Sequence, residues 1–357
     1  MHYGVQIQRF EIMEFKKQAL NQIASEMNLF EETLRAALEI PSGLTRTYNH
    51  ILISGMGAST IGGMILVDAM YYSSDIRIEV LKTMNLPSWI DENTLLVACS
   101  YSGNTYETLQ IYNQAISAGI DVIAVTHGGK LEELSEKNGN LIIKIGGTPM
   151  LPRSAIGWFL GLIGGIIEDA GGPQVRSQLA DILPSISQYT EEFTREGNYA
   201  WVIASRIEDK IPVVYAPSNL SAMALRMKNQ FNENSKMIAF SGILPEFNHN
   251  EIVGWYDDDH KYLFHPILIV DEDSEEIAKI IKATDGLLTS RDVGLDIFKV
   301  KGKSVLEKNI YAIMFGDYVS LYLAAMRNVD PDDRTSIEDL KERMREVLSC
   351  RKLPSKL

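Results

Sequence analysis

Short apolar runs alternate with longer amphipathic segments along most of this chain. Five runs in the first half predict β-strands at 50–57, 76–82, 94–102, 121–129 and 140–147. The segments between these runs are long enough to form helices. Strands that alternate with helices are typical of a parallel sheet with helices on both faces.

A second set of apolar runs begins near residue 200 and follows the same rhythm. It predicts strands at 210–218, 235–243, 263–271 and 295–302. Two α/β layers of similar size indicate an internal structural repeat. We therefore expect an α/β protein with one domain at 1–172, linking helices at 173–199 and a second domain at 200–357.

Helices are also predicted outside the strand regions. Residues 5–40 are polar and amphipathic, which predicts one or two helices that lead into the first core. The apolar, glycine-rich stretch 154–172 predicts a buried helix that ends at Gly171 or Gly172. It is too short and too interrupted for a membrane span, which needs about 20 apolar residues.

Charge and cysteine content narrow the possible partners and location. With 47 acidic and 34 basic residues the net charge is -13, which repels nucleic acid and anionic lipid over most of the surface. The only cysteines are Cys99 and Cys350, so neither a disulfide framework nor a cysteine-based zinc site is indicated. We expect a protein of the reducing cytoplasm that binds neither nucleic acid nor membrane.

Two loops rich in glycine and hydroxyl groups each follow a predicted strand and precede a helix. In SYSGNTYETL (100–109), Gly103 permits a tight turn and Thr105 is a candidate N-cap. Ser100, Ser102 and Thr105 place three hydroxyls at the positive end of that helix, where a phosphate fits. The alternative is that these hydroxyls only cap the helix.

The loop SGMGASTIGG (54–63), with Gly57 and Ser59, follows the first predicted strand in the same way. It is neither a dinucleotide fingerprint nor a Walker loop, because no lysine followed by serine or threonine is present. Loops from neighbouring parallel strands would converge on one ligand. Together the two loops predict a sugar-phosphate or nucleotide site.

The spacing of SGMGAST and SYSGNTYETL resembles the sugar isomerase (SIS) domain, in which Ser and Thr side chains and backbone amides hold a phosphosugar. PRSAIGW, NENSKM, FNHNEIVGW and the tail 314–344 are similar to archaeal and bacterial bifunctional phosphoglucose/phosphomannose isomerases. The resemblance covers nearly the whole chain. It implies two flavodoxin-like, doubly wound SIS domains with N- and C-terminal helices, and phosphate binding by Gly57, Ser59, Ser100, Ser102 and Thr105.

This resemblance implies an isomerase that converts glucose 6-phosphate and mannose 6-phosphate to fructose 6-phosphate through a cis-enediol. Glu233 would move the proton between C2 and C1, and His249 would open the sugar ring. Arg153 would stabilise the enediolate, and Lys341 would lie near the ring or C1 oxygen. Each residue also has an ordinary interpretation. Glu233 would be a surface carboxylate and His249 a hydrogen-bonding histidine. Arg153 would form a salt bridge, and Lys341 would belong to a solvated helix face.

The same resemblance bears on cofactors and partners. No hydride leaves the sugar, so no nicotinamide is required, and no residue cluster has the spacing of metal ligands, so we expect neither cofactor nor metal. In relatives the histidine reaches the site from the neighbouring subunit. The resemblance therefore implies a homodimer with shared active sites and sugar phosphates as its ligands.

Two segments depart from the family pattern. Ala58 and Thr60 stand where relatives would carry glycine, and the tail segment DPDDRTSIED is acidic where relatives often have prolines. Thr335 is the candidate for a neutral group that leaves room for both C2 epimers. The alternatives are an isomerase specific for one epimer and a phosphosugar sensor without catalysis. The presence of both Glu233 and His249 favours an isomerase.

Overall fold

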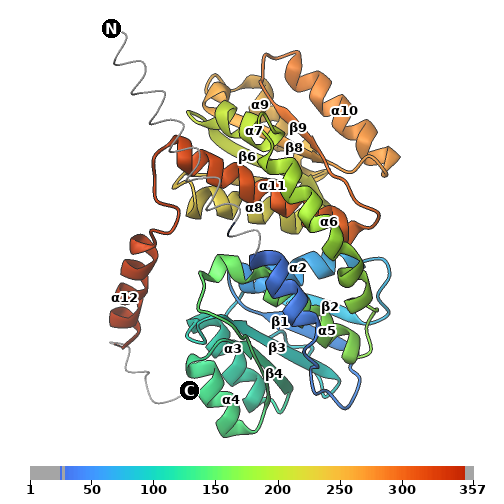
Figure 1. Ribbon diagram of the computed structural model, residues 1–357, viewed down its shortest axis with the longest axis vertical. Coiled ribbons are helices and arrows are strands. Elements are labelled where there is room, and N and C mark those ends of the chain that lie inside the picture. Colours follow the sequence, from blue (N-terminus) through green and yellow to red (C-terminus); the bar gives the residue numbers. More distant parts are fainter. Residues whose placement is uncertain (1–24, 26–28, 350–357) are drawn as a thin grey trace.

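The computed structural model describes residue 25 and residues 29–349. The N-terminal helices predicted for 5–40 lie largely outside these residues, and within them the chain is helical at 29–38. Figure 1 shows two α/β layers stacked along the long axis of the molecule. Each layer is built on its own parallel sheet.

The first layer contains a five-stranded parallel sheet with the order β2-β1-β3-β4-β5. Its strands are β1 (His50–Ser54), β2 (Arg77–Leu81), β3 (Thr94–Ser100), β4 (Asp121–Thr126) and β5 (Leu141–Lys144). All five lie within the segments predicted from the apolar runs. Every residue of β3 is buried, as expected for a central strand that is covered on both faces.

Helices cover the two faces of this sheet. They are α2 (Ala58–Met70), α3 (Tyr106–Ser117), α4 (Gly129–Asn138) and α5 (Ile156–Asp169). Because successive side chains of a strand point to opposite faces, Leu52 and Leu96 pack in one core with residues of α3 and α4. Ile51 and Val97 pack in another core with residues of α2 and α5.

The second layer repeats this plan with a four-stranded parallel sheet in the order β7-β6-β8-β9. Its strands are β6 (Ile211–Pro217), β7 (Phe240–Leu244), β8 (Phe264–Val270) and β9 (Asp296–Lys299). Its helices are α8 (Ser221–Glu233), α9 (Glu251–Asp257), α10 (Glu275–Thr289) and α11 (Val305–Met326). The order matches that of the first four strands, so the predicted α/β class with two doubly wound sheets is confirmed.

One strand starts later than predicted. β7 begins at Phe240, whereas the apolar run predicted a start at 235. The preceding residues form a turn in which Lys236 has a φ of 54°, a left-handed conformation that cannot continue a strand. The hydroxyl of Ser235 there donates to the backbone oxygen of Ser320, which lies in α11 (2.6 Å).

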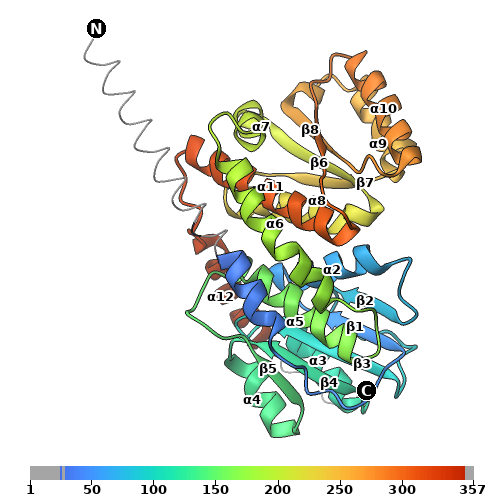
Figure 2. The ribbon, with the colours of Figure 1, turned by 45° about the vertical axis from the view of Figure 1, so that its right-hand side comes forward.

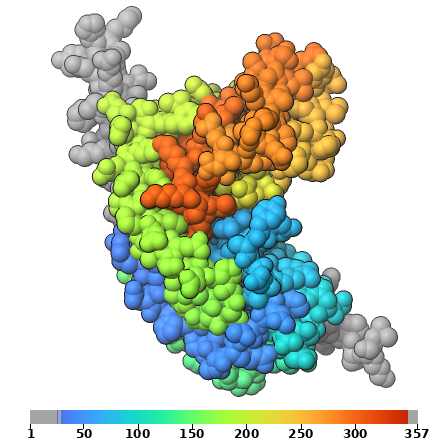
Figure 3. All heavy atoms as spheres, turned by 90° about the vertical axis from the view of Figure 1, so that its right-hand side faces the viewer, coloured from blue at the N-terminus to red at the C-terminus, as the bar shows by residue number. Residues whose placement is uncertain are grey.

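The segment predicted to hold linking helices contains α6 (Arg176–Thr194), which is followed by α7 (Tyr199–Ile207). α6 packs against α5 in the first layer and α11 in the second, and Figure 2 shows it running beside both. In Figure 3 its light green surface spans the two layers. The domain boundaries at 172 and 200 stay a prediction.

α5 is buried on all sides and is preceded by the short 3₁₀ helix η1 (Pro152–Ala155). It ends at Asp169, close to the predicted end, and Gly171 follows with a φ of 99°. None of the helices among the described residues combines the length and apolar character needed to cross a bilayer.

The contact between α2 and α5 depends on a glycine. A Cβ on Gly62 would lie 2.9 Å from the backbone nitrogen of Leu160, closer than real Cβ atoms approach such an atom. We therefore expect Gly62→Ala to lower the free energy of unfolding by about 1–3 kcal/mol, measured by urea denaturation.

Gly286 in α10 supplies the matched control. A Cβ there would meet no atom within 4 Å, so Gly286→Ala should raise the free energy of unfolding by about 0.5–1 kcal/mol. Equal stabilities for Gly62→Ala and the unsubstituted protein would contradict the close packing of α2 on α5.

Candidate active site

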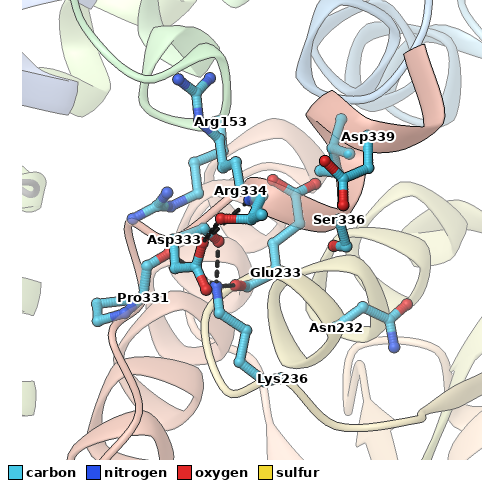
Figure 4. A pocket seen from close by; sticks show the side chains of 11 residues that line it. Arg153, Asn232, Glu233, Lys236, Pro331, Asp333, Arg334, Ser336 and Asp339 are labelled. Atoms are coloured by element: carbon cyan, nitrogen blue, oxygen red, sulfur yellow. Dashed lines mark hydrogen bonds between the residues drawn. The ribbon is translucent and has the colours of Figure 1, made fainter. Parts of the chain in front are cut away.

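A cavity of about 510 Å³ lies where the two layers meet the start of α12 (Thr335–Ser349) and the segment before it. Figure 4 shows the side chains that line it. They come from η1, from the end of α8 and from the chain at 331–339: Arg153, Asn232, Glu233, Lys236, Pro331, Asp333, Arg334, Thr335, Ser336, Ile337 and Asp339. Two predicted catalytic residues, Arg153 and Glu233, are therefore brought to one site.

Glu233 is the last residue of α8 and is half-buried. Its position is set by the two residues that follow, both of which are completely buried. The Asn234 amide donates to the Ser320 hydroxyl (2.9 Å), and the Ser235 hydroxyl donates to the Ser320 backbone oxygen (2.6 Å). These bonds attach the end of α8 to α11 and hold the Glu233 backbone at the cavity.

Arg153 lies in η1 and is 4% exposed. Its guanidinium donates to a carboxylate oxygen of Asp332 at 2.7 Å. Its backbone oxygen accepts a hydrogen bond from Arg226 of α8 (3.2 Å), and Arg226 also forms a bidentate pair with Asp317 of α11 (3.1 and 2.8 Å). A guanidinium stays cationic at any working pH and presents several donors, so Arg153 supplies a fixed positive charge beside Glu233.

Lys236 is a residue of this cavity that the sequence did not mark. Its ammonium donates to the backbone oxygens of Glu233 (2.5 Å), Asp333 (2.7 Å) and Pro331 (3.3 Å). It thereby attaches the segment before α12 to the end of α8, as the dashed lines in Figure 4 show. The pKa of Lys236 is lowered, chiefly by burial. The charge of the nearby Asp333 opposes this shift, and the charge of Arg153 adds to it.

The sequence offered only a faint signal for Lys236. The residue stands inside the quoted segment NENSKM (232–237), three positions after Glu233. Its role depends on carbonyl groups almost one hundred residues away, and backbone acceptors leave no trace in residue identity.

The two predicted phosphate loops meet at the carboxyl ends of β1 and β3, which are neighbours in the sheet. A Cβ on Gly55 would lie 2.7 Å from the Cys99 backbone oxygen, so only glycine allows this approach. Gly57 has a φ of 59° and precedes α2, and Ser59 lies buried in the first turn of that helix. The first backbone N–H groups of a helix have no partner within it and favour an anion.

The loop after β3 places its hydroxyls at the start of α3. Ser100 and Thr105 share a hydrogen bond (2.8 Å), and Thr105 is the N-cap of α3. Ser102 is exposed in the turn between them. Gly103 has a φ of 64°, and a Cβ there would lie 1.7 Å from the Gly128 backbone oxygen. The turn therefore requires glycine, as the sequence predicted.

The phosphate loops lie in the first layer, which contributes Arg153 to the cavity, and none of the five predicted phosphate-binding residues lines the cavity. Tyr101 connects the two regions, because its hydroxyl accepts a hydrogen bond from the Met150 backbone N–H (2.9 Å), three residues before Arg153. The His127 ring stacks on Tyr101 with ring centroids 5.1 Å apart. The loop after β3 is thus linked to the segment that carries Arg153.

The other two predicted catalytic residues, His249 and Lys341, lie outside the cavity within one chain. His249 ends the 3₁₀ helix η3 (Glu246–His249) and is exposed. Lys341 is exposed on α12, less than two turns beyond Thr335, which lines the cavity. The hydroxyl of Thr335 donates to Asp333 (2.6 Å).

Comparisons with known proteins identify the family of the chain. A family model described as the bacterial phospho-glucose isomerase C-terminal SIS domain matches residues 196–344. The bifunctional phosphoglucose/phosphomannose isomerase of Thermoplasma acidophilum is 37% identical over 84% of this chain and 91% of its own length. That of Caldicellulosiruptor bescii is 34% identical over 88% of this chain and 97% of its own length.

A solved structure extends the comparison to the fold. A hypothetical protein from Thermus thermophilus aligns with a TM-score of 0.71, at 16% identity, over 97% of this chain and 96% of its own. At that identity the likeness concerns the fold alone. The sequence identities to curated proteins carry the assignment, and the chain belongs to the family of bifunctional phosphoglucose/phosphomannose isomerases.

Proposed function

We propose that this chain is an aldose-ketose isomerase that interconverts glucose 6-phosphate and mannose 6-phosphate with fructose 6-phosphate. The observation that carries the proposal is the cavity in which Glu233 and the buried Arg153 lie together, in a chain of this family. Its volume of about 510 Å³ is within the usual range for small-molecule sites. We expect the enzyme to act in the cytoplasm.

The chemistry requires a base and a group that stabilises negative charge. Removal of the C2 proton from the open-chain aldose leaves an enediolate with its negative charge on O1. Transfer of the C2 hydroxyl proton to O1 and return of the first proton to C1 then give the ketose. The carboxylate of Glu233 takes and returns this proton. Arg153 lies nearby as a preorganised cation that stabilises the charge developing on the sugar oxygens. The two epimers differ only in configuration at C2, so both give the same intermediate.

Phosphate binding is assigned to the loops after β1 and β3. Gly57, Ser59, Ser100, Ser102 and Thr105 would hold the phosphate through hydroxyls and through N–H groups at the starts of α2 and α3. The sugar would then extend from these loops toward Arg153. Thr335 at the cavity is the proposed neutral group that leaves room for either epimer.

His249 and Lys341 are exposed and lie outside the cavity of their own chain. We infer that a homodimer completes the site, with His249 of one protomer opening the sugar ring in the cavity of its partner. The exposure of His249 supports this arrangement, because a ring-opening group must reach the sugar. Lys341 would approach the ring or C1 oxygen through a movement of α12 toward the bound substrate.

Glu233→Gln removes the base and keeps the size of the side chain. We expect kcat for fructose 6-phosphate to fall by about 10²–10⁴-fold, while calorimetry shows unchanged binding of the sugar phosphate. In deuterated water the unsubstituted enzyme should place deuterium at C2 of both glucose and mannose 6-phosphate, observed by NMR. As a control, Glu276→Gln at the start of the distant helix α10 should leave kcat unchanged. If Glu233→Gln had the kcat of the unsubstituted enzyme, Glu233 would not be the base.

Lys236→Met removes the ammonium that attaches the 331–333 segment to α8. Loosening this segment should lower kcat/KM by about tenfold or more, because small displacements at a reacting centre are costly. The control is Lys228→Met in α8. Among the described residues, the Lys228 ammonium bonds only to the side chain of the neighbouring Asn229. Steady-state kinetics of both variants make the measurement, and equal kcat/KM values would contradict the role of Lys236.

Shared sites can be tested by mixing inactive variants. A 1:1 mixture of Glu233→Gln and His249→Ala protomers forms heterodimers in about half of the dimers, and each has one intact site. Activity should recover to about one quarter of the unsubstituted value after subunit exchange. Each variant alone should stay inactive, and a mixture without recovery would place His249 in its own chain's site or reject its role.

A further inference from the structure

Asp68 of α2 contacts the start of α8 across the boundary between the layers. Its carboxylate accepts a hydrogen bond from the Ala222 backbone N–H (2.8 Å) and lies 3.0 Å, at both oxygens, from the Ser221 hydroxyl. Ser221 is the first residue of α8. The carboxylate therefore occupies the position of an anion at the positive end of a helix, where it is stabilised by the N–H groups.

This contact has a counterpart in the internal repeat. β1 and β6 are the corresponding strands, since each lies between the second and third strands of its sheet. β1 leads into α2, and β6 leads into α8 through the short 3₁₀ helix η2 (Ser218–Leu220). The start of α2 carries the proposed phosphate loop, whereas the start of α8 receives the carboxylate of Asp68. One half of the repeat thus supplies the anion for the other.

The two helices carry different parts of the proposed active site. α2 begins directly after Gly57 and carries Asp68 near its other end, and α8 runs from Ser221 to Glu233. The helices pack directly on each other. At about 1.5 Å per residue, the Asp68 contact lies roughly 15 Å from the phosphate loop and roughly 18 Å from Glu233. A shift at this contact moves one group relative to the other.

Relying on the proposed isomerase function, we propose that Asp68 is a positioning residue that sets the separation between the phosphate loop and Glu233. It touches neither substrate nor reacting atoms. Its effect is transmitted through two rigid helices, and correct placement of the base relative to the bound phosphate is what the chemical step requires.

The surroundings of Asp68 add a signature that depends on pH. It lies at a second cavity, of about 770 Å³, which is also lined by Lys82, Arg77, Glu79 and Asp75. Burial raises the pKa of Asp68 to about 6, and the hydrogen bonds from Ala222 and Ser221 and the charge of Lys82 oppose this shift. The protonated form is therefore relatively favoured in the folded state, and its stabilising contribution is present below about pH 4 and lost as pH rises through about 6.

The test compares Asp68→Ala with Asp68→Asn. Asp68→Ala removes the contact, so kcat for fructose 6-phosphate should fall by about ten- to a hundredfold. The inhibition constant of inorganic phosphate, which reports the phosphate loop alone, should stay within about twofold. Asp68→Asn keeps an acceptor oxygen and should restore most of kcat. Its melting temperature should rise relative to the unsubstituted protein as pH increases from about 4 to 7, because Asn carries no charge.

Further variants keep the test decisive. Asp75→Ala, at the exposed rim of the same cavity, should leave kcat and phosphate inhibition unchanged. If Asp68→Ala does not fold, Ser221→Ala removes the hydroxyl but not the Ala222 bond, and a smaller fall in kcat is expected. Unchanged kcat in the folded variants, or equal losses of kcat and phosphate affinity, would overturn the positioning role. Absence of isomerase activity in the unsubstituted protein would instead overturn the proposed function and this role with it.

Discussion

Parallel sheets must be covered on both faces, and this requirement organises the whole molecule. Two such sheets lie in one chain, and the helices between them serve both. Ile51 and Val97 of the first sheet and Val214 and Ile267 of the second belong to one continuous apolar core. The layers therefore cannot separate without exposing that core. A cavity between them is consequently held by the main hydrophobic contact of the fold.

Charged side chains are buried within this shared region. Arg226 and Asp317 are each 4% exposed and form a bidentate pair, and Arg226 also binds the backbone oxygen of Arg153. Buried charges are tolerated when they are paired and hydrogen-bonded. They make a geometric demand that apolar packing does not, because donors and acceptors must align. The backbone of Arg153 is thereby held against α8 and α11 by a directional bond.

Much of the fold could be predicted from the apolar runs, because strands buried on both faces are continuously hydrophobic. All five strands of the first sheet were located in this way. β7 was placed too early, because the left-handed turn at Lys236 interrupts a run that reads as apolar. In the site, motifs marked Arg153 and Glu233, but only the fold shows that they share a cavity. Lys236 and Asp68 escaped notice because their partners are backbone groups and a serine far away in sequence.

The repeat also has a consequence for how many ligands one chain holds. A symmetrical pair of doubly wound units would offer two equivalent helix starts, each suited to an anion. Here Gly57 before α2 faces open space, whereas the start of α8 already holds the carboxylate of Asp68. Of the two equivalent helix starts, only that of α2 is left for the proposed phosphate site, whereas that of α8 takes part in an internal contact. Binding should therefore saturate at a single sugar phosphate per polypeptide.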